Sequence, residues 1–439
     1  MTTFKDNVPA SPSPSDTSQG KMTLAQIFES LVGGNLSIRV TAYDGSSAGP
    51  ADAEYGLNLK NSRGTTYLVT APGDLGLARA YVSGDLELIG AHPGDPYEAL
   101  RALAADLEFK RPSPLTLANV ARSLGIEHFK PIAPPPQEAL PRWRRFAEGL
   151  RHSKTRDAEV IHHHYDVSNT FYEWVLGPSM TYTCACYPHP DATLEEAQEN
   201  KYRLVFEKLR LQPGDRLLDV GCGWGGMVRH AARNGVKVIG VTLSREQAIW
   251  AQKAIAEEGL GVLAEVRHSD YRDVRESQFD AVSSIGLTEH IGVANYPAYF
   301  AAMRDKLRPH GRLLNHCITR DHNRSTRTGA FIDRYVFPDG ELTGAGTVIA
   351  RMQDAGLELQ HAENFRVHYA RTLAGWVDNL VANWDECVAE VGEGTARLWG
   401  LYLVGSRIGF ERHDIELTHV LATKTDSSGV SGYPLRHTF

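Results

Sequence analysis

The sequence predicts an α/β fold, a doubly wound and mostly parallel sheet preceded by a small α+β domain. The first observation is that short apolar runs alternate with helical segments from residue 198 onward. The second is that the first of these runs, 217–220, breaks into a glycine-rich turn at Gly221. The third is the length, because 439 residues accommodate two or three domains of ordinary size.

The N-terminal part predicts a small binding or scaffold domain over residues 21–130, after a disordered tail at 1–20 that is rich in Ser, Pro, Asp and Thr. Helices are expected from Met22 and from Pro96 to about Phe109. Residues 36–42 and 65–70 alternate apolar and polar side chains, which predicts two half-buried strands. No catalytic constellation occurs in this domain, so binding of lipid or scaffolding is its expected role.

A proline-rich and basic linker is expected over residues 131–157. The stretch PIAPPP at 131–136 predicts a stiff extended spacer. Residues 140–156 then mix Trp143 and Phe146 with six Lys and Arg side chains, a composition typical of a helix at an anionic lipid surface. Taken alone, however, this stretch fits a solvated helix whose aromatic side chains pack on the next domain somewhat better than it fits a lipid-binding helix.

The second domain is predicted over residues 158–425, before a tail at 426–439. Its alternating elements indicate the parallel sheet. The expected strands are 217–220, 236–241, 262–266, 280–285 and 312–317, and the expected helices are 200–209, 227–234 and 244–258.

The turn after the first strand suits S-adenosylmethionine better than a dinucleotide. Gly221, Gly223 and Gly225 alternate around Cys222 as G-x-G-x-G, whereas a turn that grips phosphate uses G-x-G-x-x-G. Asp219 stands just before them, and a carboxylate there repels a pyrophosphate but favours an ammonium or sulfonium group. S-adenosylmethionine carries both of these groups, so we expect it as the cosubstrate.

Later segments supply the remaining cofactor contacts. The second strand ends without the carboxylate that takes ribose hydroxyls in many nucleotide-binding folds, so Thr242, Leu243 and above all Gln247 are the expected contacts. After the third strand, Tyr271 is expected to stack on adenine, with Asp270 or Arg272 at the edge of the base. Asp270, Tyr271 and Arg272 are therefore all expected to contact the cofactor.

Several separated motifs together resemble one family. They are HHHYDVSN at 162–169, TYTCACY at 181–187, SIGLTEHIG at 284–292, NHCIT at 315–319 and HYARTL at 368–373. At these positions the chain resembles the cyclopropane fatty-acid synthases, which include the mycolic-acid cyclopropane synthases, over about residues 160–420. Its length and added N-terminal domain resemble the long actinobacterial members related to tuberculostearic or 10-methylene fatty acid methyltransferases.

The resemblance implies a class I S-adenosylmethionine-dependent methyltransferase fold with an acyl-chain tunnel and a bicarbonate ion beside the reacting carbon. It implies that the residues holding this ion are Cys184, Glu289, His316, the backbone of Ile318, and Tyr369. It adds Tyr182 and Thr183 to the cofactor contacts. Thr183 stands where serine is usual, and Tyr271-Arg272 where a Trp-Glu pair is common, so the departures concern the cofactor pocket.

The implied chemistry explains these residue types. An isolated alkene attacks only a strong electrophile that is held in line, and the resulting carbocation must be kept from water. An oriented bicarbonate then serves as the base. The expected substrate is an unsaturated, oleoyl-type acyl chain of a phospholipid, and the product is either a methylene-branched chain, which is slightly favoured, or a cyclopropane.

Two other functional classes stay open at this point. A methyltransferase for a small polar N, O or S nucleophile shares the glycine turn but does not need the five ion-site residues. A lipid-binding protein without activity keeps the N-terminal domain and loses those residues. A metal site is not expected, because Cys184 and Cys186 are poorly spaced for zinc.

Composition sets the expected surroundings. The apolar fraction of 42%, the charged fraction of 23% and the net charge of −7 fit a soluble protein that does not bind nucleic acid. The five scattered cysteines fit a reducing compartment, and no segment is long and apolar enough to span a bilayer. We therefore expect a cytoplasmic protein in peripheral contact with the inner face of the cell membrane. A homodimer and a reductase acting on the product are the other partners considered.

Overall fold

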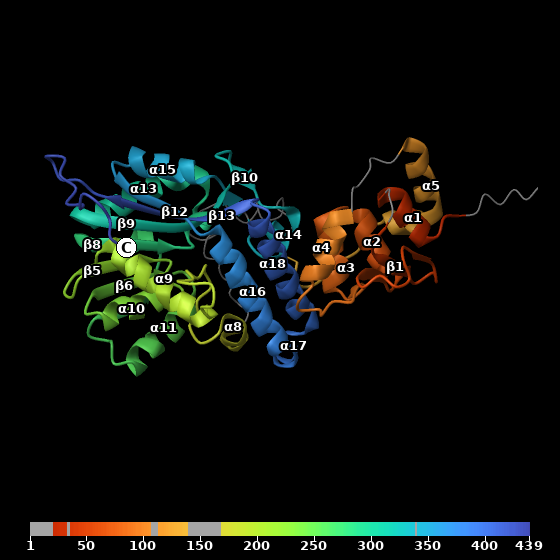
Figure 1. Cartoon of the computed structure of the whole chain (residues 1–439), viewed down its shortest axis with the longest axis horizontal. Helices are drawn as coiled ribbons and strands as arrows, with labels where there is room; N and C mark the ends of the chain where they lie inside the picture. Colours follow the sequence, from red (N-terminus) through yellow and green to blue (C-terminus); the bar gives the residue numbers. More distant parts are fainter. Residues whose placement is uncertain (1–20, 33–35, 107–112, 139–167, 339) are drawn as a thin grey trace, which may run out of the picture.

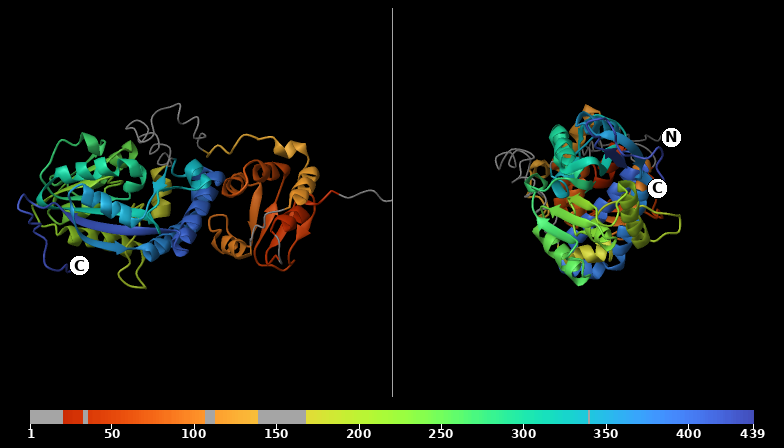
Figure 2. Two further views of the ribbon diagram at one scale, coloured as in Figure 1. Left: turned by 90° about the horizontal axis from the view of Figure 1, so that it is seen from above. Right: turned by 90° about the vertical axis from the view of Figure 1, so that its left-hand side faces the viewer.

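The computed structural model describes residues 21–32, 36–106, 113–138, 168–338 and 340–439. An N-terminal α+β unit and a larger α/β unit are joined end to end (Figure 1). Three C-terminal helices lie between the two units in both side views (Figures 1 and 2). They are α16 (Arg366–Ala382), α17 (Trp384–Val391) and α18 (Glu393–Glu411). The sequence predictions for residues 1–20 and 140–156 concern segments outside the described residues.

The N-terminal unit is built on a four-stranded sheet of order β2-β1-β3-β4, in which β1 and β3 are parallel and the other pairs antiparallel. Its apolar core includes Ile38, Tyr67 and Leu86, all less than a tenth exposed. The elements are α1 (Leu24–Val32), β1 (Arg39–Ala42), β2 (Ser47–Ala48), β3 (Gly56–Leu59), α2 (Ser62–Thr70), α3 (Asp74–Val82), β4 (Leu86–Ile89), α4 (Tyr97–Asp106), α5 (Pro114–Leu124) and η1 (Ile126–Phe129).

The strand predicted at 65–70 is wrong, because these residues form the second half of helix α2. Asn61 caps the helix by accepting a hydrogen bond from the backbone N–H of Gly64. The hydroxyls of Thr66 and Thr70 donate to the carbonyls four residues earlier, which accommodates these β-branched side chains in a helix. The strand predicted at 36–42 is confirmed in its second half, and the helix from Pro96 is confirmed as α4.

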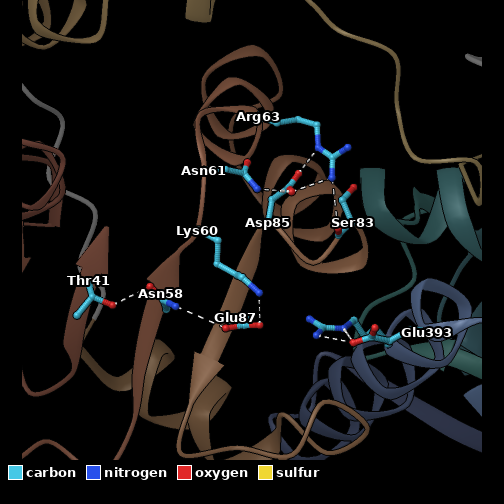
Figure 3. Close-up of polar contacts among 10 residues, drawn as sticks. Thr41, Asn58, Lys60, Asn61, Arg63, Ser83, Asp85, Glu87 and Glu393 are labelled. Atoms are coloured by element: carbon cyan, nitrogen blue, oxygen red, sulfur yellow. Dashed lines mark hydrogen bonds and ion pairs between the residues drawn. The ribbon is translucent and has the colours of Figure 1, made fainter. Parts of the chain in front are cut away.

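A buried carboxylate fastens this unit together. Asp85, which is 1% exposed, accepts hydrogen bonds from Asn61 Nδ2 at 2.8 Å and from Arg63 Nε at 2.6 Å (Figure 3). Nearby, Glu87 on β4 accepts from Lys60 Nζ at 2.7 Å. A buried charge is tolerated when it is paired and hydrogen-bonded, and here the pairing joins α2 to the start of β4.

The larger unit contains a seven-stranded sheet of order β12-β13-β9-β8-β5-β6-β7. The five strands β9, β8, β5, β6 and β7 run parallel to one another. Strand β13 lies between β12 and β9 and is antiparallel to both. The strands are β5 (Arg216–Val220), β6 (Lys237–Thr242), β7 (Ala264–His268), β8 (Phe279–Ile285), β9 (Leu307–Arg320), β12 (Glu358–Asn364) and β13 (Ile415–Thr423). This is the predicted doubly wound sheet with an added antiparallel strand pair.

Helices cover both faces of this sheet. The helices and short elements outside the sheet are α8 (Asn169–Leu176), α9 (Leu194–Leu209), α10 (Gly226–Arg233), α11 (Arg245–Glu257), η2 (Tyr271–Asp273), α12 (Thr288–Ile291), η3 (Val293–Asn295), α13 (Tyr296–Lys306), β10 (Thr326–Arg327), α14 (Ala330–Tyr335), β11 (Glu341–Leu342) and α15 (Ala345–Asp354). The predicted cap of α11 is confirmed, since Ser244 Oγ accepts from the backbone N–H of Gln247. The C-terminal residues Tyr433 and Phe439 pack on the core beneath α9 and α10.

Glu138, at the end of the first proline-rich stretch, joins the two units. Its side chain is fully buried and accepts hydrogen bonds from Arg79 of α3, Arg334 of α14 and the hydroxyl of Tyr335. On the other side of α3, Tyr97 donates to Glu411 at the end of α18 over 2.6 Å. The N-terminal unit is therefore fixed both to the C-terminal helices and to the segment that follows β9.

Candidate active site

A pocket opens at the carboxyl ends of strands β5, β6 and β8, where open α/β sheets bind their ligands. All of the cofactor residues predicted from the sequence line it except Gly225. The predicted residues that line it are Tyr182, Thr183, Asp219, Gly221, Cys222, Gly223, Thr242, Leu243, Gln247, Asp270, Tyr271 and Arg272. The structure therefore brings together residues that are up to ninety positions apart in the chain.

The floor of the pocket is the turn after β5. Gly221 and Gly223 have φ angles of +74° and +54°, which lie in the left-handed region that favours glycine. Asp219, 2% exposed, accepts a hydrogen bond from Ser283 Oγ at 2.6 Å. Burial raises the pKa of its carboxyl to about 6, so most of this group is ionised at pH 7 and can face a cationic ligand.

Gly225 has a packing role instead of a place in the pocket. It is the N-cap residue of α10, and a Cβ built on it would lie 3.1 Å from the Cβ of Ala251 in α11. The absence of a side chain thus lets two neighbouring segments approach closely. The sequence pattern alone did not separate this glycine from Gly221 and Gly223.

The two remaining walls carry polar groups held by their own hydrogen bonds. Thr242 Oγ1 donates to Gln247 Oε1 at 2.8 Å, which orients the amide that we predicted as a ligand contact. Across the pocket, Asp270 accepts from the backbone N–H and the guanidinium of Arg272. The guanidinium of Arg272 lies 5.3 Å from the centre of the Tyr271 ring, so the predicted adenine contacts form one cluster.

Lys201, which the sequence reasoning missed, supports the pocket from behind by its contact with Thr183. Its side chain is fully buried, and its Nζ donates to Thr183 Oγ1 and to Gln198 Oε1, both at 2.9 Å. Burial lowers the pKa of this ammonium to about 7. A sequence signal existed, because Lys201 and Lys208 occupy the buried stripe of α9 beside Val205, where charged side chains are unusual.

Two of the predicted ion-site residues meet where β9 extends beyond the end of β8. Strand β8 ends at Ile285, opposite His316, and β9 continues past this point. The backbone N–H of Ile318 then donates to Glu289 Oε1 at 2.7 Å. The N–H of Ile318 thus orients the carboxylate of Glu289, and the part predicted for Ile318 in holding an ion stays a prediction.

Glu289 and His316 each keep one buried polar atom without a hydrogen-bond partner in the described part of the chain. These atoms are Glu289 Oε2 and His316 Nε2. Burial raises the pKa of Glu289 to about 7 and holds the pKa of the His316 imidazole well below its usual value. Buried polar atoms are rarely left unpaired, so each of these two atoms is a candidate contact for a small polar group.

Cys184 and Tyr369 lie on the side of this position that faces the C-terminal helices. The buried thiol of Cys184 is 3.8 Å from the carbonyl oxygen of Phe365 and also donates to the carbonyl of Ala185, so this thiol contacts backbone. Tyr369 N donates to the same Phe365 carbonyl, and its ring packs between Phe410 and Trp376. Phe365 also packs on His419, which contacts His316, so one set of contacts joins Cys184, Tyr369 and His316, while Glu289 and Ile318 are joined by their own hydrogen bond.

Neither a metal site nor a membrane-spanning helix is present in what the structure describes. No group of His, Cys, Asp and Glu side chains among the described residues is arranged to hold a metal ion. Within the same ranges, no helix has the length and apolar character needed to cross a bilayer. All five cysteines are free and buried.

Comparison with known proteins identifies the family. A model of the mycolic acid cyclopropane synthetase family matches residues 152–420. The chain is 67% identical to a probable fatty acid methyltransferase of Mycobacterium tuberculosis, over 95% of this chain and 98% of that protein. It is 36% identical to the cyclopropane-fatty-acyl-phospholipid synthase of Escherichia coli K12, over 63% of this chain and 71% of that protein.

A solved structure supports the same assignment. The mycolic acid cyclopropane synthase CmaA1, in complex with SAH and CTAB, superimposes with a TM-score of 0.56 at 32% identity and covers 60% of this chain and 97% of its own. The fold of the larger unit is thus the class I methyltransferase fold that the sequence predicted. The chain belongs to the mycolic acid cyclopropane synthetase family.

Proposed function

We propose that this enzyme transfers the methyl group of S-adenosylmethionine to the double bond of an unsaturated phospholipid acyl chain, with bicarbonate bound beside the reacting carbon. Family membership supports a methyltransferase that acts on fatty acyl chains. The observation that carries the finer proposal is the pair of buried, unpartnered atoms Glu289 Oε2 and His316 Nε2.

The residues present fit a bicarbonate ion. Bicarbonate has oxygens that accept hydrogen bonds and a hydroxyl that donates one, so it can partner both a carboxylate oxygen and an imidazole nitrogen. Glu289 and His316 would hold it, with Tyr369 beside them on α16. The bound ion would supply a weak base near the acyl chain.

The chain's own side chains supply the rest of the mechanism. Asp219 and the turn at Gly221–Gly223 would hold the amino-acid portion of S-adenosylmethionine, which supplies the electrophilic methyl group. Aromatic side chains next to the pocket exclude water from a carbocation. The ring of Tyr182 has its centre 5.4 Å from that of Trp376 and 5.7 Å from that of Trp399. A proton leaving the substrate can pass towards Glu289.

The proposed product is a methylene-branched chain. If a hydride first shifts from the methylated carbon to the cationic carbon, loss of a proton from the new methyl group forms a methylene branch, whereas loss of that proton without the shift closes a cyclopropane. The relative that matches nearly the whole chain is named a probable fatty acid methyltransferase, which supports the branched product. The name of the Escherichia coli relative supports a phospholipid as the carrier of the chain.

The test is methyl transfer from labelled S-adenosylmethionine to phospholipid vesicles. With dioleoyl phospholipid, we expect the label on a mid-chain carbon; with a dipalmitoyl phospholipid of the same head group, we expect none, because only an alkene supplies electrons to the sulfonium. Proton NMR of the product distinguishes a methylene branch from a cyclopropane. Label on a head-group nitrogen, or equal labelling of saturated lipid, would contradict the proposal.

We also propose that the protein binds the surface of anionic membranes. Five exposed apolar side chains of the N-terminal unit come within twenty-five residues before the basic segment 140–156 in the sequence, and that segment itself lies outside the described residues. They are Leu115, Leu117, Ile126, Phe129 and Ile132. Exposed apolar side chains followed by a basic stretch are typical of peripheral lipid contact.

Binding to vesicles tests this proposal. We expect co-sedimentation with anionic vesicles that weakens as salt shortens the screening length to ~8 Å, and that falls when Arg144 and Arg145 are both changed to Glu. A control with the same change in charge is Lys253→Glu with Arg351→Glu, since both side chains are exposed on α11 and α15. Binding that ignores salt, or equal losses in the two variants, would argue against the proposal.

A further inference from the structure

A row of polar side chains crosses the sheet behind His316. In the antiparallel pairing, Glu363 of β12 lies opposite His419 of β13, and His419 lies opposite His316 of β9. Directly opposed residues in antiparallel strands project from the same face, so the three side chains form one line. Lys208, in the last turn of α9, reaches this line from the covering helix layer.

The contacts along this row are continuous. Lys208 Nζ lies 2.5 Å from Glu363 Oε2 and 3.2 Å from His419 Nδ1. His419 Nε2 lies 2.8 Å from His316 Nδ1. The side chain of Lys208 and both histidines are 0% exposed, whereas the side chain of Glu363 is 42% exposed. The row therefore runs from the protein surface to the candidate ion position.

The chemistry of these groups fixes the direction of each hydrogen bond. An ammonium group only donates, so His419 Nδ1 must accept from Lys208. Burial holds the pKa of both imidazoles well below the usual value, so each ring is neutral and has one N–H. His419 then carries its proton on Nε2 and donates to His316 Nδ1. His316 is left with its proton on Nε2, the atom without a partner among the described residues.

We propose that Glu363, Lys208 and His419 are positioning residues that hold His316 as a neutral Nε2–H donor. The role of Glu363 is to keep Lys208 in the ammonium form, because an uncharged amine would have a lone pair and could accept from His419. All bonds in the row would then reverse, and His316 would present a lone pair. That this donor faces bicarbonate rests on the proposed function, but the tautomer itself does not.

The inference restricts the roles open to His316. A ring fixed in this way can donate to an oxygen atom of an anion, but it cannot receive the substrate proton on Nε2. Proton transfer towards the protein therefore falls to the Glu289 side of the ion position. The row acts through His316 without touching the reacting groups, as outer partners of a catalytic imidazole do elsewhere.

Nitrogen-15 NMR of the full chain with labelled histidine reads the tautomer directly. The signals of His316 are assigned among the 18 histidines by their loss in a His316→Gln variant. We expect a protonated Nε2 and an unprotonated Nδ1 for His316 in the parent protein. In Lys208→Met we expect His316 to populate the other tautomer, turnover to fall about 10- to 100-fold, and the KM for S-adenosylmethionine to stay unchanged.

Three further variants separate positioning from folding. Lys208→Arg restores a donor that cannot accept, so both the tautomer and most of the turnover should return. Glu363→Gln, at a half-exposed position, should shift the tautomer in the same direction as Lys208→Met with less risk to the fold. Lys424→Met is the control, because this half-buried ammonium donates to the carbonyl of Leu307, outside the row, and its loss should change neither signal nor turnover.

The outcomes distinguish this inference from the proposed function. A His316 protonated on Nδ1 in the parent protein, or a tautomer unchanged in both Lys208→Met and Glu363→Gln, would overturn the inference whatever the enzyme methylates. The expected tautomer together with methyl transfer to something other than an alkene would leave the inference standing and refute the proposed function.

Discussion

A Glu289→Gln variant is expected to lose about 10²- to 10³-fold in turnover while binding S-adenosylmethionine with the affinity of the parent chain. Glutamine has the same shape and keeps an oxygen for the N–H of Ile318, so the local backbone should not change. It replaces Oε2, the buried unpartnered atom, with an amide nitrogen that cannot accept a proton. Glu289 does not line the cofactor pocket, which is why binding should survive.

The pH dependence sharpens this prediction. Burial raises the pKa of Glu289 to about 7, so the carboxylate that could receive a proton is lost as pH falls through this value. With bicarbonate held saturating, turnover of the parent enzyme should therefore rise as pH increases through about 7. Lys201 also has a pKa of about 7, but it is present in both the parent and Glu289→Gln. A rise in turnover with pH that the parent shows and the variant lacks therefore comes from Glu289.

The measurements are single-turnover methyl transfer and calorimetric titration with S-adenosylmethionine. Glu341→Gln is the matched control, because Glu341 is also half-buried and also accepts from a backbone N–H, that of Val293 at 3.0 Å. We expect it to keep near-parental turnover. Turnover near that of the parent in Glu289→Gln would mean that Glu289 only supports the end of β9.

Sequence periodicity predicted the central sheet well because β5 and β6 are short apolar runs and each is followed by its own helix. Leu217, Leu218 and Val220 are all fully buried, so their pattern carries the fold directly. Residues 65–70 misled the prediction for a local reason. Their threonines favour strands, but the Asn61 cap stabilises a helix, and the threonine hydroxyls find partners there in main-chain carbonyls.

The cofactor pocket was predictable for a topological reason. Its residues follow the carboxyl ends of successive parallel strands, and these ends meet at one edge of the sheet. The positions of Asp219, Thr242 and Asp270 follow from strand order alone. The ion-site residues required the family resemblance, since nothing in the spacing of Cys184, His316 and Tyr369 indicates that they share one set of contacts.

The row behind His316 could not be predicted from the sequence. It depends on the register of β13 between β12 and β9, which sets His419 opposite residues 56 and 103 positions away. Residues this far apart in the chain give no local pattern from which their antiparallel register could be derived. The only trace in the sequence is Lys208, a charged residue in the buried stripe of an amphipathic helix.

A Gly223→Val variant is expected to bind S-adenosylmethionine about 10- to 100-fold more weakly, with the fold retained. Gly223 lines the pocket, and a Cβ built on it meets no protein atom within 4 Å. The added side chain would thus occupy space that belongs to the ligand. Its φ of +54° also strains any residue other than glycine, at a cost of about 1–2 kcal/mol in folding stability.

Gly259→Val separates these two effects. Gly259 has a φ of +68° and equally open surroundings, but it follows α11 and does not line the pocket. Both variants should therefore lose similar stability in thermal unfolding, while only Gly223→Val loses affinity in calorimetry. If the two variants bound S-adenosylmethionine equally well, the turn at Gly221–Gly223 would not hold the ligand. Because the carboxylate of Asp219 lies at the start of the same turn, its predicted contact with the ligand's ammonium group would then also be wrong.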